Sequence, residues 1–378
     1  MEEFRERADA IVIASAKLGT AAHTDTVASL RSLVQAMNSY YSNRIEGQGT
    51  HPLNIERALR RDFSDQPDTA KLQRLALAHI EAEQALESHL RDGAAPLSSD
   101  FLQLAHQELY GRLSEADRTS EHGDVIEPGA IRHRNVTVGH HVAPEHEAIP
   151  ALLARLDEVY ALPTRSPSLL LVRAGALHHR AAWVHPFLDG NGRAIRLQTH
   201  AALFSISEGL WSVNRGLARN RDRYYAAMAD ADAPRHGDLD GRGNLSEQRF
   251  AAWCEFFLDT AEDQASFMTQ LLDLGSMRNR IAALIIFWGQ EDPRIKPEAV
   301  LPLHHMFLAG PLNRGDFAQM TGLGERTARD LLSRLLKTGL VVPTGGHTAP
   351  VRLGFPLSVL QFLLPGLYPE AAVPESAS

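Results

Sequence analysis

Residues 185–196 bring together the residue types that chemistry on a nucleotide phosphate requires: His-Pro-Phe-Leu-Asp-Gly-Asn-Gly-Arg-Ala-Ile-Arg. His185 has an intrinsic pKa near neutrality, so its imidazole could accept a proton from an attacking hydroxyl. Asp189 could hold Mg²⁺, which takes one or two carboxylates and completes its shell with phosphate oxygens and water. The stretch therefore predicts transfer of a phosphate-bearing group to a hydroxyl.

The middle of this stretch predicts an anion-binding turn at the start of a helix. Gly190 and Gly192 flank Asn191, a pattern that suits a tight turn with positive φ. The residues from Arg193 onward contain no helix breaker, so a helix is expected to begin there. Unpaired amides and the helix dipole favour an anion at such an N-terminus. Arg193 and Arg196 share one face of that helix and can bind phosphate oxygens bidentately.

Taken singly, these features have ordinary explanations: a tight turn, a structural histidine beside a proline, and two arginines on a solvated helix face. Nine specified residues at fixed spacing are very unlikely to occur together by chance. The stretch is similar to the signature of the Fic (Fido) family, His-Pro-Phe-x-Asp/Glu-Gly-Asn-Gly-Arg-x-x-Arg. Every position of that signature is filled here. The resemblance implies a mainly helical, Fic-type core that transfers AMP from ATP to a Ser, Thr or Tyr hydroxyl of a target protein (AMPylation).

The resemblance also implies a role for each residue of the stretch. His185 would be the general base, Asp189 would bind Mg²⁺, and the Gly-Asn-Gly turn would form the anion hole. Arg193 would neutralise the β-phosphate region, and Arg196 would hold the γ-phosphate. These roles agree with a reaction that depends on charge stabilisation and positioning more than on covalent catalysis. Relatives with this fold also move phosphocholine or a phosphate, so those donors stay open.

A second motif lies far upstream, at residues 42–47, Ser-Asn-Arg-Ile-Glu-Gly. Ser42 and Glu46 would share one helix face at i,i+4, and Gly47 would end that helix. Alone, this is an ordinary surface pair before a helix end. It is similar to the Fic inhibitory motif, Ser/Thr-x-x-x-Glu-Gly/Asn, which implies that Glu46 pairs with Arg196 and occupies the γ-phosphate position. Removal of AMP by the same site, with Glu46 positioning a water, stays open as an alternative.

Residues 128–144 predict a small β-hairpin, because a β-prone run ending at Val138 is followed by Gly139. From periodicity alone this is an ordinary surface hairpin. Its place before the signature is similar to that of the Fic flap, which clamps a target segment by strand addition. The resemblance implies that Val138, Gly139, His140 and His141 border the nucleotide.

A Tyr-Tyr pair ends the segment 217–225. The resemblance implies that this pair lines an adenine pocket, with Tyr225 as the candidate for stacking, although both rings could simply pack between helices. The adjacent histidines at 140–141 and 178–179 favour packing over zinc, because no third ligand follows at a suitable spacing.

Composition describes an ordinary globular chain of 378 residues, with 44% hydrophobic and 22% charged residues. Its net charge of −8 means that nucleic acid or an anionic membrane would have to meet a local patch. The single cysteine, Cys254, excludes an intrachain disulfide and suits a reducing, cytoplasmic compartment. No stretch approaches the roughly 20 apolar residues of a membrane span.

Apolar residues at helical spacing predict helices over 24–41 and 71–91, and one long helix near 245–285. The expected fold class is mainly α, with the hairpin flap and a C-terminal winged-helix-like domain. The expected divisions are an N-terminal helical region at 1–100, a Fic core at 101–235, a helical extension at 236–290, a winged-helix-like domain at 291–365 and a tail at 366–378.

The C-terminal prediction rests on a helix, a turn at 321–324, a recognition-type helix over Glu325–Lys337 and a β-prone run. Residues 312–342 hold five basic and three acidic side chains, a net of +2. Arg326, Arg329 and Arg334 could meet DNA phosphates. A protein-contact or dimerisation module is weighted slightly above DNA binding. A DNA-binding regulator that uses the Fic core as a nucleotide sensor is a third reading.

Overall fold

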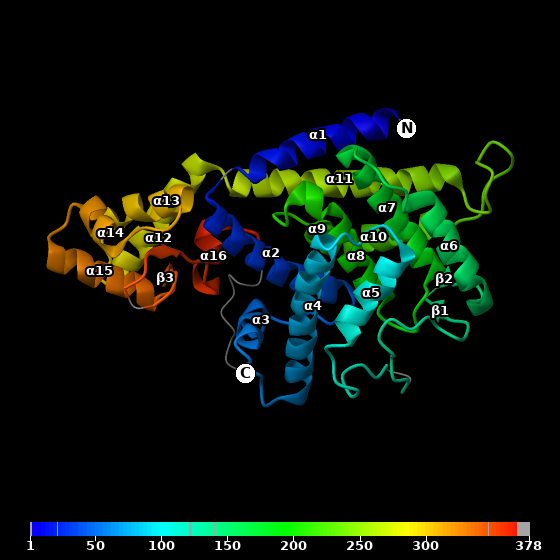
Figure 1. The fold of residues 1–378 in the computed structure, drawn as a ribbon, viewed down its shortest axis with the longest axis horizontal. Helices are drawn as coiled ribbons and strands as arrows, with labels where there is room; N and C mark the ends of the chain where they lie inside the picture. Colours follow the sequence, from blue (N-terminus) through cyan, green and yellow to red (C-terminus); the bar gives the residue numbers. More distant parts are fainter. Residues whose placement is uncertain (1, 21, 121–122, 140, 347, 369–378) are drawn as a thin grey trace.

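The computed structural model describes residues 2–20, 22–120, 123–139, 141–346 and 348–368. Sixteen α-helices, two short 3-10 helices and two short antiparallel hairpins make up their regular structure (Figure 1). The mainly α fold class and the hairpin within 128–144 are therefore confirmed. The N-terminal helices are α1 (Glu2–Leu18), α2 (Thr24–Ile45), α3 (Pro52–Leu59), α4 (Pro67–Arg91) and α5 (Ser99–Tyr110). The first hairpin pairs β1 (Thr137–Val138) with β2 (His141–Val142).

The central element is α8, which packs against α7, α5 and α4 and also contacts α1 and α2. Every residue from 193 to 203 is buried. The elements that follow the hairpin are α6 (Ile149–Tyr160), α7 (Pro167–Val184), α8 (Asn191–Ser207), α9 (Val213–Arg219), α10 (Arg221–Ala231) and α11 (Glu247–Leu271). Because α8 has no solvent-facing stripe along this stretch, each of its polar side chains must find a protein partner or a ligand.

The entry to α8 differs from the sequence prediction in one respect. The helix begins at Asn191 instead of Arg193, with Gly190 as its N-cap at φ 76°. Only Gly190 among the two turn glycines has positive φ, and Gly192 lies within the first helical turn. The preceding helix, α7, ends at Val184, and its C-cap, His185, adopts a left-handed conformation at φ 50°. The six-residue connection between the two helices, residues 185–190, therefore holds both His185 and Asp189.

The long helix expected near 245–285 is two helices. It breaks between α11 and α12 (Leu274–Glu291) at Asp273, whose carboxylate accepts a hydrogen bond of 2.8 Å from the Ser276 amide. An N-cap carboxylate stabilises the start of a new helix. The sequence did not predict this break because the helical spacing of apolar residues continues through it. The remaining elements are α13 (Val300–Ala309), α14 (Arg314–Thr321), α15 (Glu325–Lys337), β3 (Val341–Pro343), β4 (Val351–Leu353) and α16 (Leu357–Leu363).

The C-terminal unit, α12 to α16, lies at one end of the elongated molecule and docks on α2 and α3 (Figure 1). The Thr26 hydroxyl donates to the Phe307 carbonyl at 3.1 Å, and the Tyr41 hydroxyl donates to the Leu367 carbonyl at 2.9 Å. Leu367 and Tyr368 are buried, so the packed chain extends three residues into the expected tail. Helix α15 has the expected bounds and a hairpin follows it, but the comparison with winged-helix domains stays a prediction.

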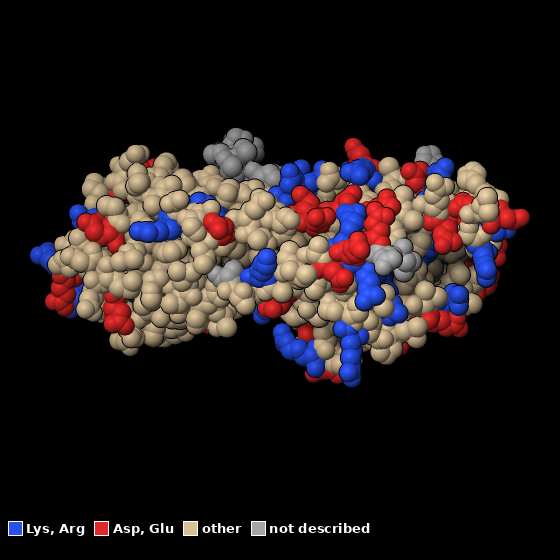
Figure 2. All heavy atoms as spheres, turned by 90° about the horizontal axis from the view of Figure 1, so that it is seen from above, with Lys and Arg blue, Asp and Glu red and all other residues tan. Residues whose placement is uncertain are grey.

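None of the helices in the described ranges is long and apolar enough to cross a membrane. Seen from above, the C-terminal unit exposes mostly uncharged side chains, whereas Lys, Arg, Asp and Glu are mixed over the rest of that face (Figure 2).

Candidate active site

His185 stands at the end of α7 with its imidazole in a protein environment that keeps it neutral. Burial, with the nearby His141 and Arg132 charges, lowers the pKa of His185 to about 4. Its ring centroid lies 6.4 Å from that of His141. At neutral pH the ring therefore has a free lone pair and can accept a proton.

Arg132 holds the backbone around this histidine. No pattern in the local sequence predicted this role. Its side chain is almost fully buried, and its Nε donates to the His185 carbonyl at 2.8 Å. Its amide donates to the Pro186 carbonyl at 2.8 Å, and its guanidinium also donates to the Arg134 and Pro144 carbonyls. One guanidinium thus joins the histidine loop to both ends of the flap.

The turn between His185 and α8 is closed by Asn191. Its side-chain oxygen accepts from the Phe187 amide and its nitrogen donates to the Phe187 carbonyl, both at 2.9 Å. Phe187 is fully buried and stacks on His106 with ring centroids 4.0 Å apart. Asn191 therefore shapes the turn through its side chain, and the ring of Phe187 fixes the turn to the core.

Tyr110 joins the carboxylate and the first arginine of the motif. Its hydroxyl donates to Asp189 Oδ2 at 3.1 Å and accepts from Arg193 Nη2 at 2.9 Å. A Cβ at Gly190 would lie only 2.3 Å from the Tyr110 ring, so this position must be glycine for the ring as well as for its φ. The side chain of Asp189 is 48% exposed, and Arg193 also donates to Gln48 at 3.0 Å.

The structure brings the upstream motif onto the second arginine. Arg196 is 1% exposed, and its Nε donates to the Ser42 hydroxyl at 3.0 Å. Its Nη2 contacts Glu46 Oε1 at 2.5 Å and the Ser42 carbonyl at 3.1 Å. The guanidinium that could bind a phosphate is therefore occupied by α2.

Glu46 lies over the first turn of α8. Burial raises its pKa, but the Arg196 and Arg193 charges outweigh that effect and the pKa is lowered. A Cβ at Gly192 would lie 2.4 Å from Glu46 Oε1, which explains a second glycine where the backbone is helical. A carboxylate thus occupies the N-terminus of a helix that favours anions.

The hairpin covers the histidine side of the site. Val138 pairs with His141 across the turn at Gly139, which has φ 59°. His140 lies outside the described residues. His141 contacts Asp232 at 3.0 Å and the Trp183 carbonyl at 2.9 Å, and its pKa is raised, chiefly by the hydrogen bond to Asp232. His141 thus connects the hairpin to the protein beneath it.

Tyr225 has a role that the sequence did not suggest. Its hydroxyl donates to the Ile45 carbonyl at 3.1 Å, and Arg221 donates to the same carbonyl at 2.9 Å. Both side chains therefore hold the end of α2 beside Glu46. His178 lies in the core, bonded to Thr199 at 2.8 Å and to a tyrosine hydroxyl of α10 at 3.0 Å.

Two neighbouring cavities meet at Glu46. The first, of about 650 Å³, is lined by His185, Gly192, Arg196 and Tyr225, and the second, of about 690 Å³, is lined by Asp189 and Arg193. The residues lining both are Glu46, Val138 and Gly139. An elongated ligand with an apolar group and a polyanionic tail fits the two cavities together. Glu46 lies where the two cavities meet.

A family model, "Fic/DOC family", matches residues 96–203, which span α5, the hairpin, α7 and most of α8. The matched segment contains the whole 185–196 motif. This segment is a Fic domain. A protein named "Protein adenylyltransferase Fic" from Nematostella vectensis is 28% identical over 205 residues, 53% of this chain and 43% of that protein. The chain thus aligns with less than half the length of that relative.

Solved structures share the fold well beyond the Fic domain. A Fic family protein from Desulfovibrio desulfuricans superposes with a TM-score of 0.52 at 19% identity, covering 93% of this chain and 96% of that one. Fic-1 from C. elegans superposes with a TM-score of 0.51 at 17% identity, covering 74% of each chain. At these identities the likeness concerns the fold alone.

Proposed function

We propose that this chain is an autoinhibited adenylyltransferase that moves AMP from ATP to a Ser, Thr or Tyr hydroxyl of a target protein. The observation that carries the proposal is the contact between Arg196 and Glu46 at the start of α8, beside a neutral His185. A buried guanidinium, helix amides and an imidazole are the groups that phosphoryl-type transfer needs. The name of the Nematostella relative, protein adenylyltransferase Fic, supports the same activity.

In this proposal, the hydroxyl oxygen of the target attacks the α-phosphorus of ATP. The new bond joins that oxygen to the α-phosphorus, the bond to the β-phosphate oxygen breaks, and pyrophosphate leaves. His185 accepts the hydroxyl proton. Arg193 and the amides of the α8 N-terminus stabilise charge on the phosphates, and Arg196 holds the γ-phosphate once Glu46 has left it.

Asp189 is the residue that fits a Mg²⁺ ion in this proposal. Its carboxylate is half exposed in the polar cavity and oriented by Tyr110, and Mg²⁺ shares its shell between one carboxylate, phosphates and water. A bound Mg²⁺ would neutralise phosphate charge there.

Inhibition in this proposal is a competition between two anions for one cation. While Glu46 holds Arg196, ATP can still enter, but its phosphates cannot take the productive position. A displacement of about 1 Å can cost on the order of 100-fold in rate. Release of α2 is then the event that activates the enzyme.

The test uses the Glu46→Gly protein with ATP labelled on either the α- or the γ-phosphate, in the presence of Mg²⁺. We expect α-label on the protein itself and on lysate proteins, no γ-label, and loss of labelling in Glu46→Gly/His185→Ala. Label arriving only from the γ-phosphate would exclude AMP transfer. Loss of AMP from a pre-labelled target, dependent on Glu46, would instead identify the site as a remover of AMP.

The C-terminal unit offers less support for a DNA-binding regulator. Arg329 pairs with Glu325, and Arg334 lies 3.6 Å from Asp292, which also pairs with Arg294, so an acid stands beside two of the three candidate phosphate contacts. The visible face of that unit is mostly uncharged (Figure 2). A target or dimer contact is therefore our preferred role for the unit.

A further inference from the structure

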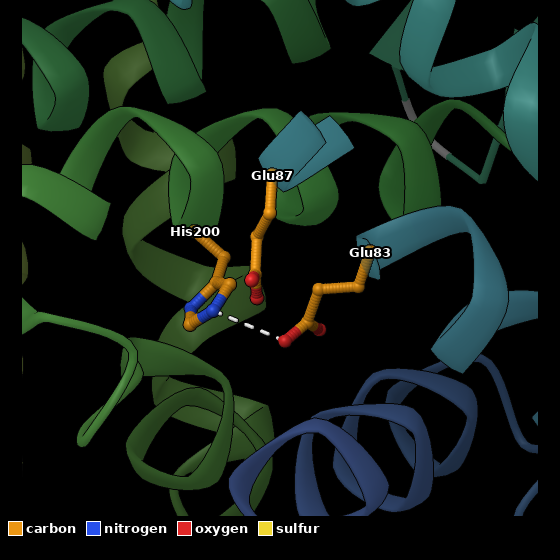
Figure 3. A group of neighbouring side chains, drawn as sticks. All are labelled: Glu83, Glu87 and His200. Atoms are coloured by element: carbon orange, nitrogen blue, oxygen red, sulfur yellow. Dashed lines mark ion pairs between the residues drawn. The ribbon is translucent and has the colours of Figure 1, made fainter. Parts of the chain in front are cut away.

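A buried group of ionisable side chains lies behind the active-site arginines. Glu83 and Glu87 are one turn apart on α4, and His200 faces them from α8, one turn beyond Arg196 (Figure 3). Their exposures are 2%, 8% and 2%, respectively. The reaction proposed above uses none of the three, and burying carboxylates is costly without compensation.

The spacing of the three side chains is that of a metal site. One ligand atom from each lies within 4.8 Å of the others, and His200 Nε2 is 3.1 Å from Glu83 Oε1. Two ligands of one tetrahedral Zn²⁺ are about 3.3 Å apart when each bond is about 2.0 Å. Two of the atoms therefore already have the required separation, and a change of side-chain torsion brings in Glu87.

Unsatisfied polar atoms provide a separate indication of a ligand. Within the described residues, neither ring nitrogen of His200 makes a hydrogen bond, despite the short Nε2 contact with Glu83. Asn38, on α2 and fully buried, directs its amide at both Glu83 oxygens at 3.1 and 3.2 Å, while its own Oδ1 has no hydrogen-bond partner among those residues. Such atoms are normally satisfied, by protein, water or an ion.

The charges point the same way. Two carboxylates face one imidazole, and Arg91, which is 3.7 Å from Glu87, is 69% exposed in its side chain. Gln35 donates to Glu87 at 2.8 Å but carries no charge. With both carboxylates ionised and the imidazole neutral, the three buried side chains carry two negative charges, which a divalent cation would balance.

We propose that Glu83, Glu87 and His200 bind a divalent transition-metal cation of the Zn²⁺ or Mn²⁺ class, with Asn38 Oδ1 as a fourth ligand after its amide turns over. A mixed set of imidazole nitrogen and carboxylate oxygen suits these ions, whereas Ca²⁺ and Mg²⁺ sites use oxygen ligands. The site is separate from the Asp189 carboxylate, which lies in the polar cavity.

Such an ion joins three helices. Glu83 and Glu87 belong to α4, His200 to α8, and Asn38 to α2, one turn before Ser42. Coordination therefore braces α2 against the helix that carries Arg196. Resting on the proposed function, this bracing strengthens the inhibitory contact, so a loaded protein is more tightly inhibited than a metal-free one.

The test measures zinc retained by the full chain after chelator treatment, reloading with ZnCl₂ and removal of excess. We expect one ion per chain in the wild type, and the same in Asp189→Asn and in Glu81→Gln, an acid on α4 that pairs with Arg61. Glu87→Gln and His200→Gln should bind at least about 10-fold more weakly. Zinc should raise the melting temperature of the wild type by a few degrees and leave that of Glu87→Gln unchanged.

Crystals of the zinc-loaded wild type give a readout that needs no variant to fold. We expect an anomalous difference peak among Glu83, Glu87 and His200. No retained zinc, a peak elsewhere, or undiminished binding in Glu87→Gln would overturn the metal site. None of these readouts depends on AMP transfer, so the metal proposal and the proposed function can fail separately.

Discussion

At the scale of single residues, the site depends on keeping His185 neutral while two arginines stay charged. Burial is the main cause of the lowered His185 pKa, and the same burial would be costly for Arg193 and Arg196 without their anionic and hydroxyl partners. Asp189, Tyr110 and Glu46 supply those partners. The proposed base and the proposed phosphate-binding groups thus differ in charge because an imidazole titrates near neutrality and loses its proton on burial, whereas a guanidinium stays charged.

The pH dependence of the reaction follows from that pKa. Because the pKa of His185 is lowered to about 4, the base is deprotonated above that value and is lost only as pH falls through it. We expect kcat/KM of Glu46→Gly, measured at saturating Mg²⁺, to stay nearly level from pH 8 to about 5. An acidic limb centred near 6.5 would mean that the imidazole is not held neutral by its surroundings.

Tyr110→Phe tests the positioning of Asp189 and Arg193. The variant keeps the ring that packs on Gly190 and loses one hydrogen bond to each charged group. Hydrogen bonds to charged groups are worth about 1.5–3 kcal/mol, so we expect kcat/KM of the Glu46→Gly enzyme to fall about 10- to 100-fold. Tyr160→Phe, on α6, is the control and should change little. Equal activities for the two variants would remove Tyr110 from the site.

The sequence predicted the site residues that lie close together along the chain, and it did not predict those that lie far from the motif in sequence. His185, Asp189 and the two arginines share a fixed spacing, and spacing is what makes a motif recognisable. Tyr110 and Arg132 act through single contacts across the fold, and a lone tyrosine or arginine carries no such pattern. Both were therefore missed.

At the scale of elements, the proposed inhibition makes α2 a removable part of the site. Its last turns place Ser42 and Glu46 on Arg196, while Tyr225 and Arg221 hold its final carbonyl, that of Ile45. The sequence predicted this helix and its end at Gly47, since apolar spacing and a left-handed glycine are local signals. It could not predict the capped break at Asp273, because the apolar spacing runs through it.

Ser42→Ala should release the inhibition only in part. The change removes the hydroxyl that accepts from Arg196 Nε at 3.0 Å, but it leaves the Ser42 carbonyl and Glu46 in place. Alanine suits a helix interior, so the fold should be unaffected. We expect several-fold faster auto-AMPylation than the wild type, and less than that of Glu46→Gly. Ser32→Ala, an exposed site on the same helix, should match the wild type, and an inactive Ser42→Ala would contradict this account.

At the scale of the whole molecule, the interior holds several neutral histidines. The pKa values of His79 and His178 are lowered to about 3, and those of His106 and His185 to about 4, with burial as the largest cause in each case. In the unfolded chain these groups would titrate near 6.5. The unfolded state therefore binds more protons between pH 6.5 and about 4, so stability falls as pH falls through that window.

Melting temperatures measured in steps from pH 7.5 to 4.5 check this prediction. We expect a steep decline below pH 6.5, and a flatter profile for His79→Leu, because neither His79 ring nitrogen has a hydrogen-bond partner within the described residues. A melting temperature that stays constant to pH 4.5 would show that these histidines are not buried and neutral.

The central claim is that Glu46 holds Arg196 in place of a phosphate. It is tested most directly by the initial rate at which AMP, measured by intact mass spectrometry, accumulates on the chain itself with ATP and Mg²⁺. We predict that Glu46→Gly is faster than the wild type by on the order of 100-fold, while Glu291→Gly, an exposed acid at the end of α12, is unchanged. Equal rates for wild type and Glu46→Gly would contradict the account.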